Sequence, residues 1–195
     1  MKTMINTIIL LTLTTVITSC GMQSIPTAKN EVEAQWAEVQ NTYQRRSDLI
    51  PNLVATVKGY ASHEKETLEA VISARAKATQ VTVDPTKLDA NSLGKFQQAQ
   101  GSLSQALGKL MVISERYPDL KANQNFRDLQ IQLEGTENRI SVARKRYIES
   151  IKRYNNLITV PPTSWFNSMF YKHEKAPQFK VDNLDEVKQA PKVKF

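Results

Sequence analysis

Residues 119–158 read DLKANQNFRDLQIQLEGTENRISVARKRYIESIKRYNNLI, and the spacing of the large residues is clearest here. One row of large residues recurs every seven positions: Phe126, Leu133, Ile140, Tyr147 and Tyr154. A companion row contains Leu129, Thr136, Ala143, Ser150 and Leu157. Two such rows form one stripe along an α-helix, which is stable when the stripe is buried against other helices. We therefore expect one long amphipathic helix from about residue 119 to residue 158.

A second long helix is expected at about residues 28–60. Its seam alternates steps of four and three and contains Val32, Trp36, Val39, Tyr43, Arg46, Ile50, Leu53, Val57 and Tyr60. Pro51 lies inside this segment and lacks the N–H group that would bond the carbonyl of Ser47. The seam nevertheless keeps its phase across Pro51, so the pattern predicts one kinked helix.

Two shorter helices are expected between these long ones, at about residues 63–80 and 86–116. The first would carry Leu68, Ile72 and Arg75, after a stop at Gly59 and an N-cap at Ser62. The second has a seam of Phe96, Ala99, Leu103, Ala106, Leu110, Ile113 and Tyr117. Residues 80–86 read as a loop, and Pro118 ends the later helix.

The composition agrees with long helices. Among 195 residues, 41% are hydrophobic, and only 6 glycines and 8 prolines are present. So few breakers argue against a many-stranded sandwich. We expect an all-α fold, an antiparallel four-helix bundle over residues 28–160 with a mostly irregular C-terminal tail at 161–195. The tail aromatics are expected to pack loosely: Trp165, Phe166, Phe170, Tyr171 and Phe179.

The N-terminus reads as an export signal over residues 1–19, with Lys2 ahead of an apolar stretch at 5–17. The following sequence, Ile-Thr-Ser-Cys at 17–20, resembles a bacterial lipobox, which implies cleavage before Cys20 and acylation of that cysteine. Residues 20–27 would then form a tether. A plain secretory signal with an incidental cysteine, or an uncleaved anchor, is the alternative. Gly21, where an aspartate retains some lipoproteins at the inner membrane, favours the outer membrane of the cell envelope.

Six blocks of sequence resemble the LemA family: RRSDLIPNLV at 45–54, VKGYASHE at 57–64, ARA at 74–76, ERYPDLKAN at 115–123, QIQLEGTENRI at 130–140 and AR at 143–144. The family positions within them are Arg46, Asp48, Pro51, His63, Glu64, Arg75, Glu134, Glu137, Arg139 and Arg144. The resemblance implies a four-helix bundle at a bacterial membrane, outside the cytoplasm, with no enzymatic activity established for the family. Many relatives have an uncleaved membrane helix, where this chain has the lipobox. Ile148 also departs from an asparagine that is common after the tyrosine.

The inventory of reactive residues argues against several kinds of chemistry. One cysteine and two histidines exclude a zinc site made of histidine and cysteine, and we expect no metal or cofactor. Ser62 and Lys65 match a Ser-x-x-Lys pattern, but the companion motifs of serine acyltransferases are absent. His63 and Glu64 open like a zincin motif, yet Thr67 occupies the position of its second histidine. We therefore interpret Ser62 as a helix cap and His63 as a surface or capping histidine.

Arg46 is the one charged residue on an apolar seam. Its guanidinium either reaches water past its own aliphatic stem or pairs with a carboxylate on the last helix. If the two long helices are antiparallel, Arg46 lies level with Glu134 to Glu137, while Asp48 faces solvent or the adjoining turn. Such a pair would set the register of the helices.

The last half of the 119–158 helix is rich in cations: Arg139, Arg144, Lys145, Arg146, Lys152 and Arg153. With 26 Lys and Arg against 19 Asp and Glu, the whole chain carries a net charge of +7. A basic face of this kind is either simply solvated or in contact with anionic lipid headgroups. Export past a membrane makes nucleic acid a poor partner.

Together these features predict a lipid-anchored, non-enzymatic module. It would attach to a membrane through lipidated Cys20 and bind or scaffold an unidentified protein of the envelope. The rival interpretation is an envelope hydrolase or accessory enzyme that uses Ser62, or Glu134 and Glu137 as acid and base. A spacer that holds the tail at a set height is a third reading.

Overall fold

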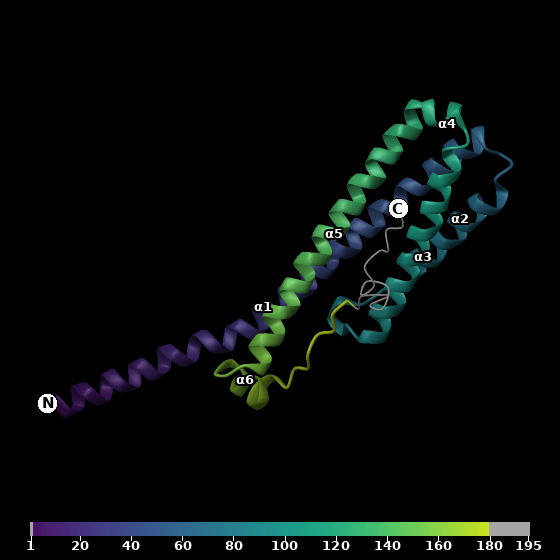
Figure 1. Ribbon diagram of the computed structural model, residues 1–195. Coiled ribbons are helices and arrows are strands. Elements are labelled where there is room, and N and C mark those ends of the chain that lie inside the picture. Colours follow the sequence, from purple (N-terminus) through teal and green to yellow (C-terminus); the bar gives the residue numbers. More distant parts are fainter. Residues whose placement is uncertain (1, 180–195) are drawn as a thin grey trace, which may run out of the picture.

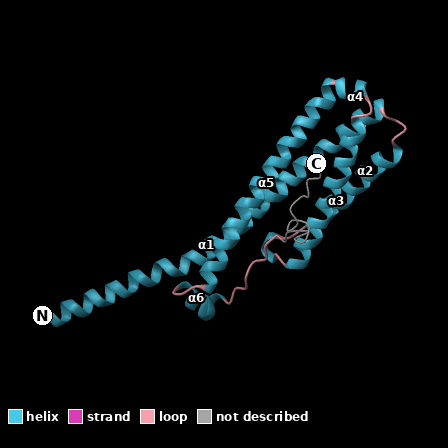
Figure 2. Cartoon of the chain, in the orientation of Figure 1, coloured by secondary structure: helices cyan, strands magenta, loops and turns pink. Residues whose placement is uncertain are grey.

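The structure is a computed structural model that describes the backbone of residues 2–179 and the side chains of residues 23–179. Within that part the regular structure is helical and no strand forms, which confirms the all-α prediction. The long helices are α1 (Lys2–Tyr60), α2 (Lys65–Gln80), α3 (Ala90–Ser114) and α5 (Gln124–Thr159). They run alternately in opposite directions and lie side by side (Figures 1 and 2).

Short elements connect and follow the long helices. They are η1 (Pro85–Lys87), α4 (Pro118–Ala122), α6 (Thr163–Phe166) and the π-helical turn η2 (Asn167–Tyr171). The helix expected at 119–158 is therefore wrong at its start. Asn123 has an extended backbone with ψ of 129°, and its side chain accepts a hydrogen bond from the backbone N–H of Phe126. This N-cap separates α4 from α5.

Helix α1 packs along α5 and against α2, and α2 packs against α3, whereas α3 and α5 approach each other much less closely. The buried side chains form two clusters. One, named here the aromatic cluster, includes Trp36, Tyr43, Phe96 and Tyr147 among aliphatic side chains. The other is largely aliphatic and includes Ile50, Leu53, Leu103, Leu110 and Leu133. Apolar burial in these seams, more than helix propensity, stabilises the helices.

The seam of α1 is confirmed from Val32 to Val57 and extends further toward the N-terminus. Ile25 and Ala28 are buried in the aromatic cluster, so the helix begins well before the expected residue 28 and includes residues 20–27. Cys20 and the lipobox lie on the part of α1 whose side chains are outside the described residues. Among the residues searched, no helix is both long and apolar enough to cross a membrane.

The connection from α1 to α2 differs from the prediction in its details. Residues 61–64 form a turn through backbone hydrogen bonds, from Ala61 N–H to the Val57 carbonyl and from Glu64 N–H to the Ala61 carbonyl. The expected stop at Gly59 and cap at Ser62 are wrong, because Gly59 remains helical and Glu64 occupies the N-cap position without a capping side-chain bond.

Two expected seam positions are exposed in the structure. Ile72 is half exposed, because Val71 and Ala78 occupy the buried positions of α2. Tyr60 also leaves the core at the end of α1, and its hydroxyl accepts a hydrogen bond from the Asn123 amide at 2.9 Å.

The C-terminal tail is not uniformly loose. Phe179 packs against the rings of Tyr147 and Trp36, with centroid separations of 5.3 and 6.0 Å. The polar groups of Asn155 bond the backbone N–H and carbonyl of Ala176 at 2.9 and 3.1 Å. The segment after η2 is therefore held along α5, while Trp165 and Phe170 are exposed.

The carbonyl that Pro51 leaves without its helical partner is satisfied from another helix. The Nε–H of Arg75 on α2 donates to the Ser47 carbonyl at 2.8 Å. Helix α1 continues through Pro51, and Pro51 itself is exposed to solvent. The proline therefore creates an acceptor that attaches α2 to α1, which gives the two family positions Pro51 and Arg75 a common structural role.

A double substitution tests this role. We expect Arg75→Met to lower the free energy of unfolding by about 1–2 kcal/mol, because it leaves the Ser47 carbonyl without a donor. In a Pro51→Ala background, the backbone N–H of residue 51 can bond that carbonyl, so the same change should cost about half as much or less. Urea denaturation of the four proteins measures both costs. Equal costs in the two backgrounds would show that Arg75 acts independently of Pro51.

Candidate functional site: a buried arginine and the adjoining groove

The guanidinium of Arg46 is 1% exposed and lies between the two clusters of the core. Its Nη1 donates to Oε1 of Glu137 at 2.6 Å and to Oγ of Ser104 at 2.9 Å. Its Nη2 donates to Oε1 of Gln100 at 2.7 Å. The Arg46–Glu137 pair expected from the sequence is therefore present. A buried charge of this kind is tolerated because several acceptors surround it.

The polar groups around Arg46 connect all four long helices. Arg46 lies on α1, Gln100 and Ser104 on α3, and Glu137 on α5, while the Gln100 amide donates to the Ala78 carbonyl of α2 at 3.3 Å. Sequence reasoning missed Gln100 and Ser104. The expected seam placed Ala99 in the core. In the structure the next residue, Gln100, is the buried one.

Tyr43 and Arg144 extend this cluster toward the tail. The Arg46 guanidinium lies 5.1 Å from the centroid of the Tyr43 ring, and that of Arg144 lies 4.6 Å from the centroid of Phe179. Burial raises the pKa of Tyr43 above its usual value, and the nearby charges of Arg144 and Arg46 oppose this shift. Tyr43 is therefore a neutral phenol at physiological pH. The cation–π contact between Arg144 of α5 and Phe179 attaches the tail to α5.

A groove of about 430 Å³ lies beside the ion pair, between α3 and α5, which are not closely packed against each other. Its apolar walls include Leu107, Met111 and Leu133. Glu134 and Glu137 line it as well, and both are exposed, so the groove combines apolar walls with an acidic edge. Gly108 also lines it, and a Cβ atom at that position would meet nothing within 4 Å. Such a surface suits an apolar segment that carries a cation.

The remaining family positions serve separate local contacts. Asp48 is exposed and accepts a hydrogen bond from Gln44, as expected for a solvent-facing residue. Glu64 accepts from the Arg116 guanidinium at 3.1 Å and from the Tyr117 hydroxyl at 3.0 Å, which connects the first turn to the end of α3. His63 is exposed in that same turn.

The basic residues of α5 do not join the Arg46 cluster, apart from Arg144. Arg139 is exposed and its Nε donates to the Gly135 carbonyl of its own helix at 3.2 Å. Glu134 is exposed and accepts from Gln130 at 3.1 Å, so it does not share the ion pair of Glu137.

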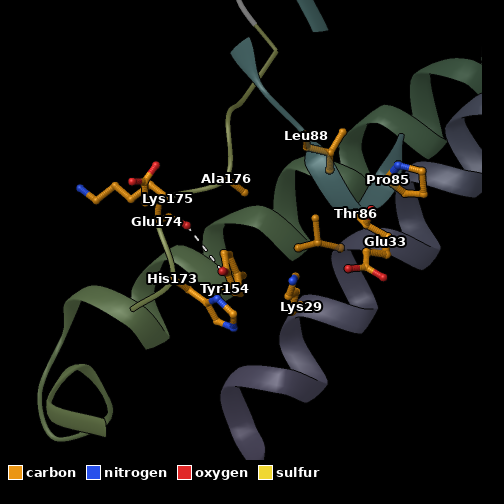
Figure 3. Close-up of a pocket in the computed structure, with 11 residues that line it drawn as sticks. Lys29, Glu33, Pro85, Thr86, Leu88, Tyr154, His173, Glu174, Lys175 and Ala176 are labelled. Carbon is orange, nitrogen blue, oxygen red and sulfur yellow. Dashed lines mark hydrogen bonds between the residues drawn. The ribbon is translucent and has the colours of Figure 1, made fainter. Parts of the chain in front are cut away.

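A second, smaller pocket of about 210 Å³ lies near the other end of the bundle (Figure 3). Residues of α1, η1, α5 and the tail surround it, among them Lys29, Tyr154 and His173. The Tyr154 hydroxyl points toward the Glu174 carbonyl at 3.5 Å. Burial, with the charge of Lys29, lowers the pKa of His173 below its usual value, so its ring is neutral at physiological pH.

The positions of Ser62, Glu134 and Glu137 bear on the enzyme alternative. No group of three or more His, Cys, Asp and Glu side chains among the described residues could hold a metal ion. Ser62 is exposed in the 61–64 turn, and Oε1 of Glu137 is occupied by Arg46. The geometry therefore supports a structural ion pair beside an open groove better than an acid–base pair of carboxylates.

The coupling between Arg46 and Glu137 is open to direct measurement. We expect Glu137→Gln to lower the free energy of unfolding by about 1–2 kcal/mol, since it leaves a guanidinium that stays charged without its counter-ion. The effect is at the low end because Glu137 is half exposed. Glu134→Gln, one helical turn away and unpaired with Arg46, should change stability by less than about 0.5 kcal/mol. In an Arg46→Met background, Glu137→Gln should cost almost nothing. Additive losses in urea denaturation would mean that the two residues are not coupled.

Comparison with known proteins agrees with the motif blocks. One relative is Protein LemA of Metamycoplasma hominis, 27% identical over 143 residues, which cover 73% of this chain and 56% of that protein. Another is Magnetosome protein MamQ of Magnetospirillum gryphiswaldense, 28% identical over 172 residues, which cover 76% of this chain and 63% of that protein. The chain thus spans about three fifths of the length of these relatives. The model of the LemA family matches residues 35–195, so the chain belongs to the LemA family.

Proposed function

We propose that this protein is a lipid-anchored module of the bacterial envelope that presents the groove between α3 and α5 to a protein partner. Membership of the LemA family supports an envelope-associated protein, and proteins of that family are not known as enzymes. The observation that carries the proposal is the groove itself, with apolar walls and an acidic edge. We place the anchor at Cys20, in the outer membrane, on the ground of the sequence around it.

The partner segment is defined by the chemistry of the groove. Residues 104–111 of α3 and 130–137 of α5 flank it, and eight helical residues extend about 12 Å. A short apolar segment fits this length, and a lysine or arginine on it would meet Glu134. The chain as a whole is basic, so the acidic edge of the groove would attract a cationic segment more strongly than the rest of the surface does. The enzyme alternative needs two free carboxylates, and Arg46 already holds one oxygen of Glu137.

The anchor is tested by acylation in the producing bacterium. We expect Cys20→Ala to lose metabolic labelling with a fatty-acid analogue and to accumulate as the longer precursor. Ser19→Ala, which keeps a small residue beside the cysteine, should be labelled and processed normally. Label retained by Cys20→Ala would contradict the anchor.

The groove is tested by photo-crosslinking from position 111 of the full chain in its own envelope. We expect one defined protein product that disappears with Gly108→Phe, because a side chain at 108 enters the groove without displacing the core. Gly101→Phe is the matched control, since Gly101 also has open space around its Cβ but does not line the groove. Glu134→Lys should weaken the product as well. A product that survives Gly108→Phe, or that joins two copies of this chain, would overturn the proposal.

A further inference from the structure

The stretch from residue 160 to residue 171 contains no charged residue and reads VPPTSWFNSMFY. It carries four large hydrophobic side chains that are more than half exposed: Val160 at 53%, Trp165 at 65%, Met169 at 71% and Phe170 at 58%. The other exposed hydrophobic residues in the described part are scattered singly over α1, α2, α3 and α5. Single exposed residues are common, whereas a cluster on one short segment marks an interaction surface.

Hydrogen bonds between Asn167 and residues on either side of the segment fix the turn that carries these side chains. Asn167 is buried, and its amide donates to the His173 carbonyl at 3.0 Å and accepts from the His173 N–H at 3.0 Å. The same amide group lies 3.5 Å from the Ile158 carbonyl at the end of α5. Asn167 thus satisfies backbone polar groups on the inner side of the turn. The exposure of Trp165, Met169 and Phe170 therefore belongs to a fixed conformation.

The segment lies at the end of the bundle from which the N-terminal part of α1 extends (Figure 1). Helix α6 contacts both α5 and α1, and Ile25, Ile158 and Tyr171 share one cluster. Cys20 precedes Ile25 by five residues, or about 8 Å along a helix axis. An acyl chain on Cys20, or an N-terminal segment retained as an anchor, would place a bilayer at this end of the molecule.

Cations flank the uncharged stretch on both sides. Lys152 and Arg153 precede it, Lys172 and Lys175 follow it, and all four are exposed, with Glu174 as the acidic residue among them. Basic side chains beside exposed Trp and Phe are typical of protein surfaces that lie at the headgroup level of a membrane. Lysine and arginine there attract anionic phospholipids.

We infer that Val160, Trp165, Met169 and Phe170 form a surface that contacts a bilayer containing anionic phospholipids, with Lys172 and Lys175 at the headgroups. This inference rests on the proposed membrane anchoring of the chain and deepens it. One attachment point leaves a bundle free to tilt. A second contact on α6 and η2 fixes the long axis of the bundle relative to the membrane.

Tryptophan fluorescence tests the contact, because the chain has two tryptophans and Trp36 is fully buried. The full-length protein, purified from membranes with its anchor, is reconstituted into phosphatidylethanolamine–phosphatidylglycerol vesicles with brominated or unmodified acyl chains. We expect brominated lipid to quench the emission of the unaltered protein. Trp165→Phe, which keeps Trp36, should show no quenching. Both proteins keep Trp36, so the comparison requires no substitution in the core.

The charges are tested in the same vesicles. Lys172→Glu with Lys175→Glu should reduce quenching severalfold in anionic vesicles and have little effect in phosphatidylcholine vesicles. The matched control is Lys77→Glu with Lys109→Glu, two exposed lysines of α2 and α3.

Unquenched Trp165 in brominated vesicles would overturn the inference. So would protection of Trp165 from aqueous iodide without quenching by brominated lipid, because a protein or a second copy would then cover the surface. The anchor is judged separately by labelling. If Trp165 is quenched although Cys20 is not acylated, the membrane-contacting surface is supported and the lipid anchor is rejected. If Cys20 is acylated and Trp165 is not quenched, the anchor is supported and the surface is rejected.

Discussion

The structure depends on the need to satisfy one buried guanidinium. Arg46 remains charged, so the core around it must supply acceptors at fixed positions, and these come from Gln100, Ser104 and Glu137. A slip of α3 or α5 by one turn would remove an acceptor and leave the charge without compensation. Apolar seams tolerate such slips far better, because one leucine replaces another. The polar layer therefore fixes the register of a bundle whose seams alone leave it weakly specified.

The same layer explains why a groove can persist in a small bundle. Helices α3 and α5 are held together across Arg46 and through the other two long helices, because α5 packs on α1, α3 packs on α2, and α1 packs on α2. Beyond the layer, Leu107 of α3 and Leu133 of α5 line an open space between the two helices. Pro51 and Arg75 act in a comparable way on the opposite side, where a missing N–H group gives α2 a fixed attachment point.

Sequence periodicity predicts what depends on a single helix and fails where distant segments decide. The seam from Val32 to Val57 and the row from Phe126 to Tyr154 are buried as expected, since helix geometry alone determines which residues share a face. The Arg46–Glu137 pair also follows from antiparallel alignment. Gln100 reads as an ordinary helix residue until Arg46 is placed beside it. Likewise the cap at Asn123 and the packing of Phe179 on Trp36 depend on contacts that no local pattern contains.

The groove and the exposed surface on α6 lie far apart along the bundle. This separation would determine how high the groove lies above a bilayer that the α6 end contacts. About 25 residues of α5 separate Leu133 from Ile158, a distance of roughly 38 Å along a helix. A rigid bundle fixed at the α6 end would present the groove at that height above a bilayer. If the bundle were held by one flexible point, the groove would instead sample every height down to the headgroups. The polar layer at Arg46 keeps the helices in register between the two surfaces, so orientation at one end is carried to the other.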